Sequence, residues 1–256
     1  MTDLKFHQLT KEKGVARVVL DRPKHNVFNI DMMEELTALL ADLNTDTDLK
    51  CVVLAANGAS WCAGVEVSDH KPELAPDMIR VFDALLKQIH ALEIPSIAAV
   101  HGACLGGGME VAVACDMIVA SKAAIFGQPE IKLGFLPPYA AVRLPHLVGP
   151  SKAIEICTTG RRYSAEQCYQ MGLVSDLMEA DSFEEGLTKL VKELQHCSPL
   201  IIRLNKKAVT QHYGMDINQA MASVGDMFLN QLMKTEDTQE GIKSFEEKRR
   251  PEWKNK

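Results

Sequence analysis

The stretch HGACLGGGMEVAVACD, residues 101–116, places three consecutive glycines and one acid directly after a predicted strand. That strand is SIAAVHG, residues 96–102, and the residues after the glycines favour a helix. A helix that begins on glycines leaves backbone N–H groups exposed at its N-terminus, where the helix dipole also favours negative charge. The stretch predicts either a site for an anion or a developing oxyanion, or close packing of a helix on a sheet.

Glu110 falls in the first turn of this predicted helix and is followed by apolar residues. Apolar surroundings raise the pKa of a carboxyl group unless a cation or a hydrogen bond compensates. Glu110 is therefore a candidate catalytic group. The alternative is an acid that stands there because the helix dipole favours it. The glycine run is neither a Walker loop nor a dinucleotide fingerprint, so a nucleotide phosphate site is not indicated.

Strands and helices alternate on both sides of the glycine run. VARVVLD (15–21), CVVLAA (51–56) and MIVAS (117–121) are typical of buried strands, and residues 31–44 and 76–92 have apolar residues at helical spacing. This alternation predicts an α/β fold with a parallel sheet.

The strand signals become rare after about residue 150, where segments with helical spacing and terminal glycines follow one another. We therefore predict two regions, an α/β core over residues 1–195 and a helical region over residues 196–256.

Two more segments resemble the glycine run in their setting. Glu130 lies among apolar residues in AIFGQPEIKLGFLPP (124–138), and Val65 lies in the loop GASWCAGVEV (58–67), which follows the strand 51–56. Ligands of open α/β sheets bind at the carboxyl ends of the strands. Two N–H donors and two carboxylates at one such edge are what the enolate of a thioester requires.

Composition excludes several classes of protein. The net charge of −6 disfavours a nucleic-acid partner, and the seven cysteines form no C-x-x-C pair, which indicates free thiols and no metal site. The N-terminus MTDLKFHQLTKEKG has no apolar segment of a signal peptide, and no apolar run is long enough for a membrane span. We expect a cytoplasmic protein with no membrane association.

The chain resembles the crotonase superfamily of enoyl-CoA hydratases and isomerases along nearly its whole length. Ordered matches include SWCAGVEV, IPSIAAVHGACLGGGMEVAVACDMIVA, IFGQPEIKLG and, near the end, EGIKSFEEKRRPEW. The resemblance implies a spiral of β-β-α units with a C-terminal helical trimerisation region, assembled as a trimer or hexamer. It also implies an acyl-CoA thioester as substrate, with no cofactor and no metal.

The resemblance implies a role for each candidate residue. The N–H groups of Val65 and Gly107 correspond to the donors of the oxyanion hole. Glu110 corresponds to the acid that deprotonates water, and Glu130 to the acid that protonates a substrate carbon. Further positions match residues that contact CoA in relatives, although a solvated surface lysine is an equal alternative at Lys24 and Lys248. These positions are Lys24, Val27, Ala63, Val67, Phe245 and Lys248.

The chain departs from its relatives beside the predicted site. It has PPYAA from Pro137 on, where hydratases of straight-chain substrates commonly carry Pro-Gly-Ala-Gly-Gly. Pro138 has no N–H to offer a catalytic water. Pro138 and Tyr139 predict a stiffer acyl pocket that suits a flat ring, and Trp61 is either another wall of that pocket or a packing residue.

The segments AGVEVSDHKPE and GQPEIKLGFLPPYAAV resemble one subgroup, the cyclohexa-1,5-diene-1-carbonyl-CoA hydratases of anaerobic benzoyl-CoA degradation. This predicts a hydro-lyase that adds water to that ring. The alternatives are a general enoyl-CoA hydratase or isomerase of fatty or amino acid degradation and, less favoured because both acids are present, a non-catalytic protein that binds CoA esters.

Overall fold

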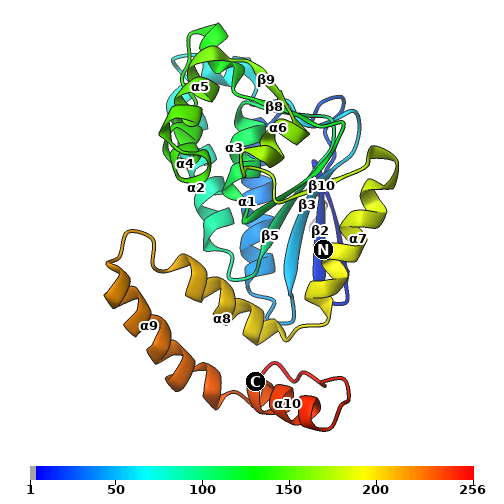
Figure 1. The fold of residues 1–256 in the computed structure, drawn as a ribbon. Helices are drawn as coiled ribbons and strands as arrows, with labels where there is room; N and C mark the ends of the chain where they lie inside the picture. The colour runs from blue at the N-terminus through cyan, green and yellow to red at the C-terminus, as the bar shows by residue number, and fades with distance from the viewer. Residues whose placement is uncertain (1–3) are drawn as a thin grey trace.

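Successive β-β-α units build the fold (Figure 1). The first unit gives both of its strands, β1 and β2, to the larger of two sheets, and the next units give one strand to each sheet. The computed structural model describes residues 4–256. In the unit β3-β4-α2, for example, β3 joins the larger sheet and β4 the smaller one, and β5-β6-α3 repeats this arrangement. The spiral of β-β-α units that the resemblance implies is therefore confirmed.

The larger sheet has the strand order β1-β2-β3-β5-β7-β10, in which β1 is antiparallel to β2 and the other neighbours are parallel. Its strands are β1 His7–Glu12, β2 Val15–Leu20, β3 Cys51–Ala56, β5 Ser96–Val100, β7 Met117–Ser121 and β10 Asp176–Met178. The smaller sheet has the order β4-β6-β8-β9. Its strands are β4 Ser60–Cys62, β6 Ala103–Leu105, β8 Ile125–Gly127 and β9 Arg162–Ser164.

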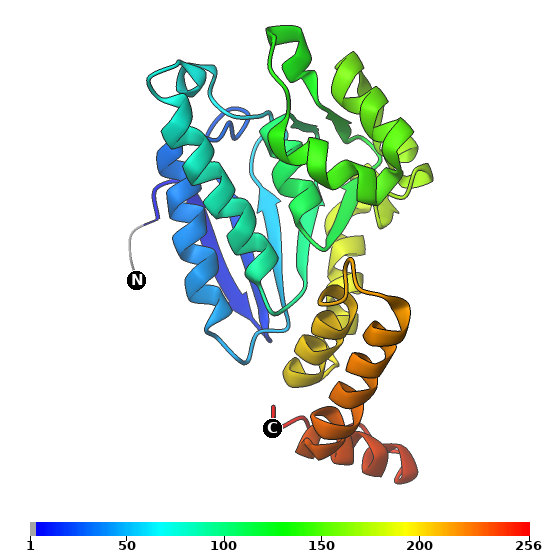
Figure 2. The same ribbon diagram turned by 90° about the vertical axis from the view of Figure 1, so that its left-hand side faces the viewer.

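Helices cover both sheets and form the end of the chain (Figures 1 and 2). The α-helices are α1 Ile30–Asn44, α2 Ala75–Ala91, α3 Gly107–Ala114, α4 Pro138–Val148, α5 Pro150–Thr159, α6 Ala165–Gln170, α7 Phe183–Gln195, α8 Pro199–Thr210, α9 Ile217–Asn230 and α10 Glu236–Glu246. Four 3-10 helices accompany them: η1 Val67–His70, η2 Pro129–Leu133, η3 Ala180–Ser182 and η4 Leu232–Lys234.

Both faces of the larger sheet are buried, because alternate residues of its strands point to opposite sides. Along β3, Val52 and Leu54 belong to the main core with α1 and α2, whereas Val53 packs on the other face with Phe183 and Leu187 of α7. The helices α1 and α2 lie side by side over the first face (Figure 2). Cover on both faces explains why the sequences of the central strands β3, β5 and β7 are almost wholly apolar, whereas the edge strand β1 is mostly polar.

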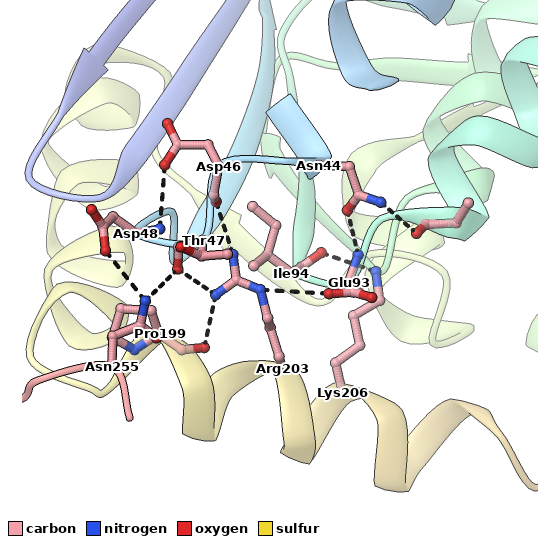
Figure 3. Close-up of polar contacts among 11 residues, drawn as sticks. Asn44, Asp46, Thr47, Asp48, Glu93, Ile94, Pro199, Arg203, Lys206 and Asn255 are labelled. Atoms are coloured by element: carbon pink, nitrogen blue, oxygen red, sulfur yellow. Dashed lines mark hydrogen bonds and ion pairs between the residues drawn. The ribbon is translucent and has the colours of Figure 1, made fainter. Parts of the chain in front are cut away.

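The C-terminal helices gather beyond one end of the larger sheet, with α9 and α10 farther from it than α8 (Figures 1 and 2). Polar contacts hold α8 to the loops that precede β3 and β5 (Figure 3) and to the residue before β7. Arg203 donates to the carbonyl of Thr47 at 2.6 Å, and Lys206 donates to the carbonyl of Ile94 at 3.0 Å and to Asp116 at 2.6 Å. The division of the chain near residue 195 stays a prediction.

The predicted strands at 15–21, 51–56, 96–102 and 117–121 correspond to β2, β3, β5 and β7, so these predictions are confirmed. The strands of the smaller sheet were not predicted, because each has three residues and shows no periodicity. All seven cysteines are free, as the sequence predicts. Within residues 4–256, no helix is long and apolar enough to cross a membrane.

Candidate active site

Three neighbouring parallel strands of the smaller sheet deliver the three predicted site loops to one edge. The loop with Val65 follows β4, the glycine run follows β6, and the segment with Glu130 follows β8. The sequence predicts the loop of Val65 at the end of strand 51–56, and this prediction is wrong, since β4 lies between them. The short strands bring the loops together because their carboxyl ends meet at the same edge.

Two backbone N–H groups at this edge have no acceptor within residues 4–256. The residues on either side of Val65 bond to Phe28, since Gly64 accepts from its N–H at 2.8 Å and Glu66 donates to its carbonyl at 2.8 Å. The N–H of Val65 therefore points to the opposite side of this bridge. Gly107 is the first residue of α3, so its N–H has no partner inside the helix.

The glycine run permits a close approach of the backbone to both neighbouring loops. A Cβ on Gly107 would lie 2.5 Å from Cγ2 of Val65, and one on Gly108 would lie 2.5 Å from the carbonyl oxygen of Cys62. Gly106 has φ +56°, a conformation that side chains disfavour. The packing interpretation of the glycines is therefore confirmed, and the same close approach leaves the N–H of Gly107 uncovered beside Val65.

Glu110 is only 3% exposed and is held by the N-terminus of α4. Its Oε1 accepts from the N–H groups of Tyr139 and Ala140, each at 2.8 Å, whereas Oε2 has no donor within residues 4–256. Burial above all, together with the charge of Glu130, raises the pKa of Glu110 to about 7, although the two amides lower it. The free oxygen is available to a water or a substrate.

Glu130 begins η2 together with Pro129 and is half-buried. Burial raises its pKa to about 7 as well. With its side-chain amide turned so that nitrogen faces the carboxylate, Gln128 donates to the two oxygens of Glu130 at 2.9 and 3.0 Å. Gln128 is fully buried, and it is a site residue that was not predicted. Its position in the sequence could have indicated this role, because a glutamine at the end of an apolar strand needs a buried hydrogen-bond partner.

One cavity of about 540 Å³ brings the two carboxylates and the two loops together. Glu110, Glu130, Gly107 and Val65 all line it, and so do Ala63, Val67 and Pro138. The remaining lining side chains are mostly apolar, and three of them are rings: His70, which belongs to the segment AGVEVSDHKPE, and Phe82 and Phe135, which the sequence did not indicate. The ring of His70 packs on that of Phe135 with centroids 5.0 Å apart.

Neither Trp61 nor Tyr139 lines the cavity. For Trp61 the packing alternative is confirmed, whereas the prediction that Tyr139 is a wall of the pocket is wrong. Trp61 is fully buried in the core, where its indole N–H donates to the carbonyl of Leu54 at 3.1 Å. The ring of Tyr139 packs against the main core, and its hydroxyl contacts the imidazole of His90. Both rings carry a polar atom that finds a partner inside the protein, which fixes their direction.

The remaining candidates lie outside the cavity. Lys24 is exposed and Val27 is half-buried, and neither belongs to the cavity lining. Phe245 is 86% exposed in α10, and Lys248 follows that helix. Since α10 lies beyond the sheet end that α8 contacts, these two residues do not meet the cavity of the same chain.

A second cavity, of about 710 Å³, lies between α8 and the core and is lined by His90, Asp116, Arg143 and Lys206 among others. It contains neither of the two free N–H groups and neither Glu110 nor Glu130, so its chemistry differs from that of the smaller cavity. Within residues 4–256, no group of three or more His, Cys, Asp or Glu side chains is placed to hold a metal ion.

Known proteins are similar to this chain in sequence and in fold. A crotonyl-CoA hydratase of Syntrophomonas wolfei is 33% identical over 249 residues, which cover 94% of this chain and 95% of the relative. A cyclohexa-1,5-dienecarbonyl-CoA hydratase of Thauera aromatica is 30% identical over 248 residues, which cover 97% of this chain and 96% of the relative. The crystal structure of an enoyl-CoA hydratase from Bacillus anthracis superposes with a TM-score of 0.93 at 27% identity, covering 98% of this chain and 100% of the other.

Residues 10–256 also match the family model described as enoyl-CoA hydratase/isomerase. The relatives are named as hydratases, which are hydro-lyases, and the match extends through every segment that forms the cavity. The protein is therefore an enzyme of the hydratase type that acts on acyl-CoA, and the chain belongs to the enoyl-CoA hydratase/isomerase family.

Proposed function

We propose that the protein adds water across a double bond of an acyl-CoA thioester at the cavity of Glu110 and Glu130. The N–H groups of Val65 and Gly107 hold the thioester oxygen and stabilise the negative charge that it gains. The free Oε2 of Glu110 holds a water and takes its proton, and Glu130 gives a proton to a substrate carbon. The observation that carries the proposal is that two buried carboxyls and two free amides line a single cavity.

The pKa values and the hydrogen bonds of Glu110 and Glu130 support these two roles. Burial raises the pKa of both carboxyls to about 7, and the charge of Glu130 contributes to the shift at Glu110, so each carboxyl can take up or release a proton near neutral pH. The two amides of α4 stabilise the charged form of Glu110. We therefore assign the base to Glu110, whose Oε2 is free to hold a water, and the proton donor to Glu130.

For the acyl group we propose a ring, that of cyclohexa-1,5-diene-1-carbonyl-CoA. The support is the stiff turn at Pro138, the ring walls of Phe82, Phe135 and His70, and the relative from Thauera aromatica that bears this name. Hydroxyl adds to the β carbon, and the proton goes to the far end of the conjugated diene. This substrate therefore needs a flat pocket for its ring and a proton donor that lies away from the α carbon.

The second candidate is a general enoyl-CoA hydratase or isomerase. The relative named crotonyl-CoA hydratase is slightly more similar in sequence, and the cavity of about 540 Å³ also accommodates a straight chain. An isomerase needs one base, so Glu130 alone would suffice. In that case the amides of α4 and Glu110 would have no role in the reaction.

The experiment compares cyclohexa-1,5-diene-1-carbonyl-CoA with crotonyl-CoA on the purified protein, with mass spectrometry to detect the addition of one water. We expect the higher kcat/KM for the ring. Faster turnover of crotonyl-CoA would overturn the ring proposal but leave the hydratase proposal intact. Loss of about a hundredfold or more in each of Glu110→Gln and Glu130→Gln supports hydration by both acids. Turnover without a gain in mass that persists in Glu110→Gln would favour the isomerase.

Binding of the CoA moiety and assembly belong to the same proposal. Lys24, Val27, Ala63 and Val67 would contact CoA, and the protein would work as a trimer or hexamer without a cofactor. In such an assembly Phe245 and Lys248 would reach the CoA of a neighbouring subunit. The exposed aromatic ring of Phe245 supports this, because an isolated chain gives it no apolar partner.

A further inference from the structure

The first turn of α4 determines where Glu110 can be held. The N–H groups of Tyr139 and Ala140 both donate to Oε1 of Glu110 at 2.8 Å. Pro138 opens the helix and contributes no N–H, so these two amides are the first that the helix offers. A displacement of this turn would move the donors off the carboxylate.

The side chain of Tyr139 ties the same turn to another helix. Its hydroxyl lies within hydrogen-bond distance of Nε2 of His90, and the two rings are 5.7 Å apart between centroids. His90 stands in the last turn of α2, and an earlier residue of that helix, Phe82, lines the acyl cavity. The contact therefore connects the helix that holds Glu110 with a helix that forms the cavity wall.

We propose that His90 and Tyr139 are a positioning pair, whose hydrogen bond keeps the first turn of α4 where its amides reach Glu110. The inference rests on the proposed function, in which Glu110 is the base. The relatives that commonly carry Pro-Gly-Ala-Gly-Gly here have alanine at the position of Tyr139, and a methyl group cannot make such a contact. This chain has a proline and a tyrosine instead, and the tyrosine finds a partner outside the cavity.

Charged and titratable groups surround the pair on several sides. Arg143, Asp116 and Lys206 face His90. Arg143, Cys115 and Glu110 face Tyr139, while Glu130 and Asp83 act on Glu110. Burial lowers the pKa of His90 and raises that of Tyr139, so the contact joins two neutral groups near neutral pH.

The test begins with Tyr139→Phe, which keeps the ring and removes the hydroxyl. We expect kcat for hydration to fall about fivefold, the effect of one neutral hydrogen bond, while KM stays within about twofold. Because amides on the carboxylate lower its pKa, a looser turn also moves the acid limb of the pH profile to higher pH. A role in folding alone would reduce the active fraction and leave that limb unchanged.

Variants of His90 test the other half of the pair. His90→Leu should reproduce Tyr139→Phe, and the double variant should be no worse than either one, since all three lack the same bond. His90→Gln places an amide near the position of Nε2 and should retain most of kcat. Tyr163→Phe is the matched control, because it removes a hydroxyl that donates to Glu155 at 3.0 Å, away from the cavity.

Infrared titration measures the pKa of the Glu110 carboxyl directly and tests the positioning pair without any turnover. The carboxyl band is assigned by its absence from Glu110→Gln. A higher pKa of Glu110 in Tyr139→Phe, and the native value in Tyr163→Phe, would support the positioning pair. An unchanged kcat, pH limb and carboxyl pKa in Tyr139→Phe would overturn it, as would additive losses in the double variant. Failure of the hydratase proposal would appear differently, as absence of hydration by the unmodified protein.

Discussion

The carboxylate of Glu130 occupies the space that any side chain at Gly106 would need. A Cβ at Gly106 would lie 2.8 Å from Oε1 of Glu130 and 3.7 Å from the Cα of Gly64. The glycine run and the second acid are thus one structural unit, although 24 positions separate residues 106 and 130 in the sequence.

Gly106→Ala is expected to displace Glu130 and to lower kcat about a hundredfold, the effect of misplacing a reacting group by about 1 Å. Steady-state kinetics on folded protein measures it. Gly172→Ala is the control, because Gly172 also has a positive φ, of +80°, but nothing lies within 4 Å of its Cβ position. Equal losses in both variants would show that backbone strain, and not the contact with Glu130, causes the effect.

Gln128→Met keeps the length of the side chain and removes the donor to Glu130. We expect kcat to fall about tenfold, since a buried carboxylate then loses a charge-assisted hydrogen bond. The pKa of Glu130 should rise further, because the lost bond favoured its charged form. Gln211→Met, at the end of α8, should leave kcat unchanged. Native kcat in Gln128→Met would contradict a role of Gln128 in holding Glu130.

The buried carboxyls of Glu110 and Glu130 should make the protein less stable as the pH rises. Their pKa is about 7 in the folded state against 4.5 for an ordinary Glu, so the folded state binds more protons between these values. The stability that this contributes is full below about pH 4.5 and is lost as the pH rises through about 7. Urea unfolding at several pH values should show a smaller decline in Glu110→Gln/Glu130→Gln. An identical decline would contradict the raised pKa values.

Lys206→Met should destabilise the protein by about 1–3 kcal/mol, because it leaves Asp116 without its cation. The pair is 2.6 Å apart, and the Lys206 side chain is 9% exposed. Lys189→Met is the matched control, since the pair of Lys189 with Glu185 is exposed and should contribute less than about 0.5 kcal/mol. Equal midpoints of urea unfolding in the two variants would show that the contact of α8 with the core adds no stability.

The long elements of the fold could be predicted because their patterns are local. Strand β3 is an apolar run that ends at a turn, and α1 has its buried leucines at helical spacing behind Asn29, which caps it through Met32. The short strands of the smaller sheet have no such pattern. They are held by pairing with neighbours distant in sequence, as Phe126 in β8 pairs with Cys104 and Tyr163.

The candidate site could be predicted only in part, for a related reason. The residue types at Glu110, Glu130 and Gly107 stand out because carboxyls and glycines are unusual among apolar residues. The direction of Tyr139 and Trp61 does not follow from the sequence, since each ring turns toward a distant partner for its polar atom. Gln128 was not predicted as a donor because its role depends on where the carboxylate of Glu130 lies in space.

The infrared spectrum of a bound thioester tests the central claim most directly. The variant Glu110→Gln/Glu130→Gln should bind crotonyl-CoA, labelled at its carbonyl carbon, without converting it. The amides of Val65 and Gly107 should then donate to the carbonyl oxygen of the unreacted substrate. The account predicts that the C=O stretch shifts to lower frequency than in solution, because two N–H groups polarise the bond. A bound thioester whose carbonyl absorbs at its solution frequency would contradict it.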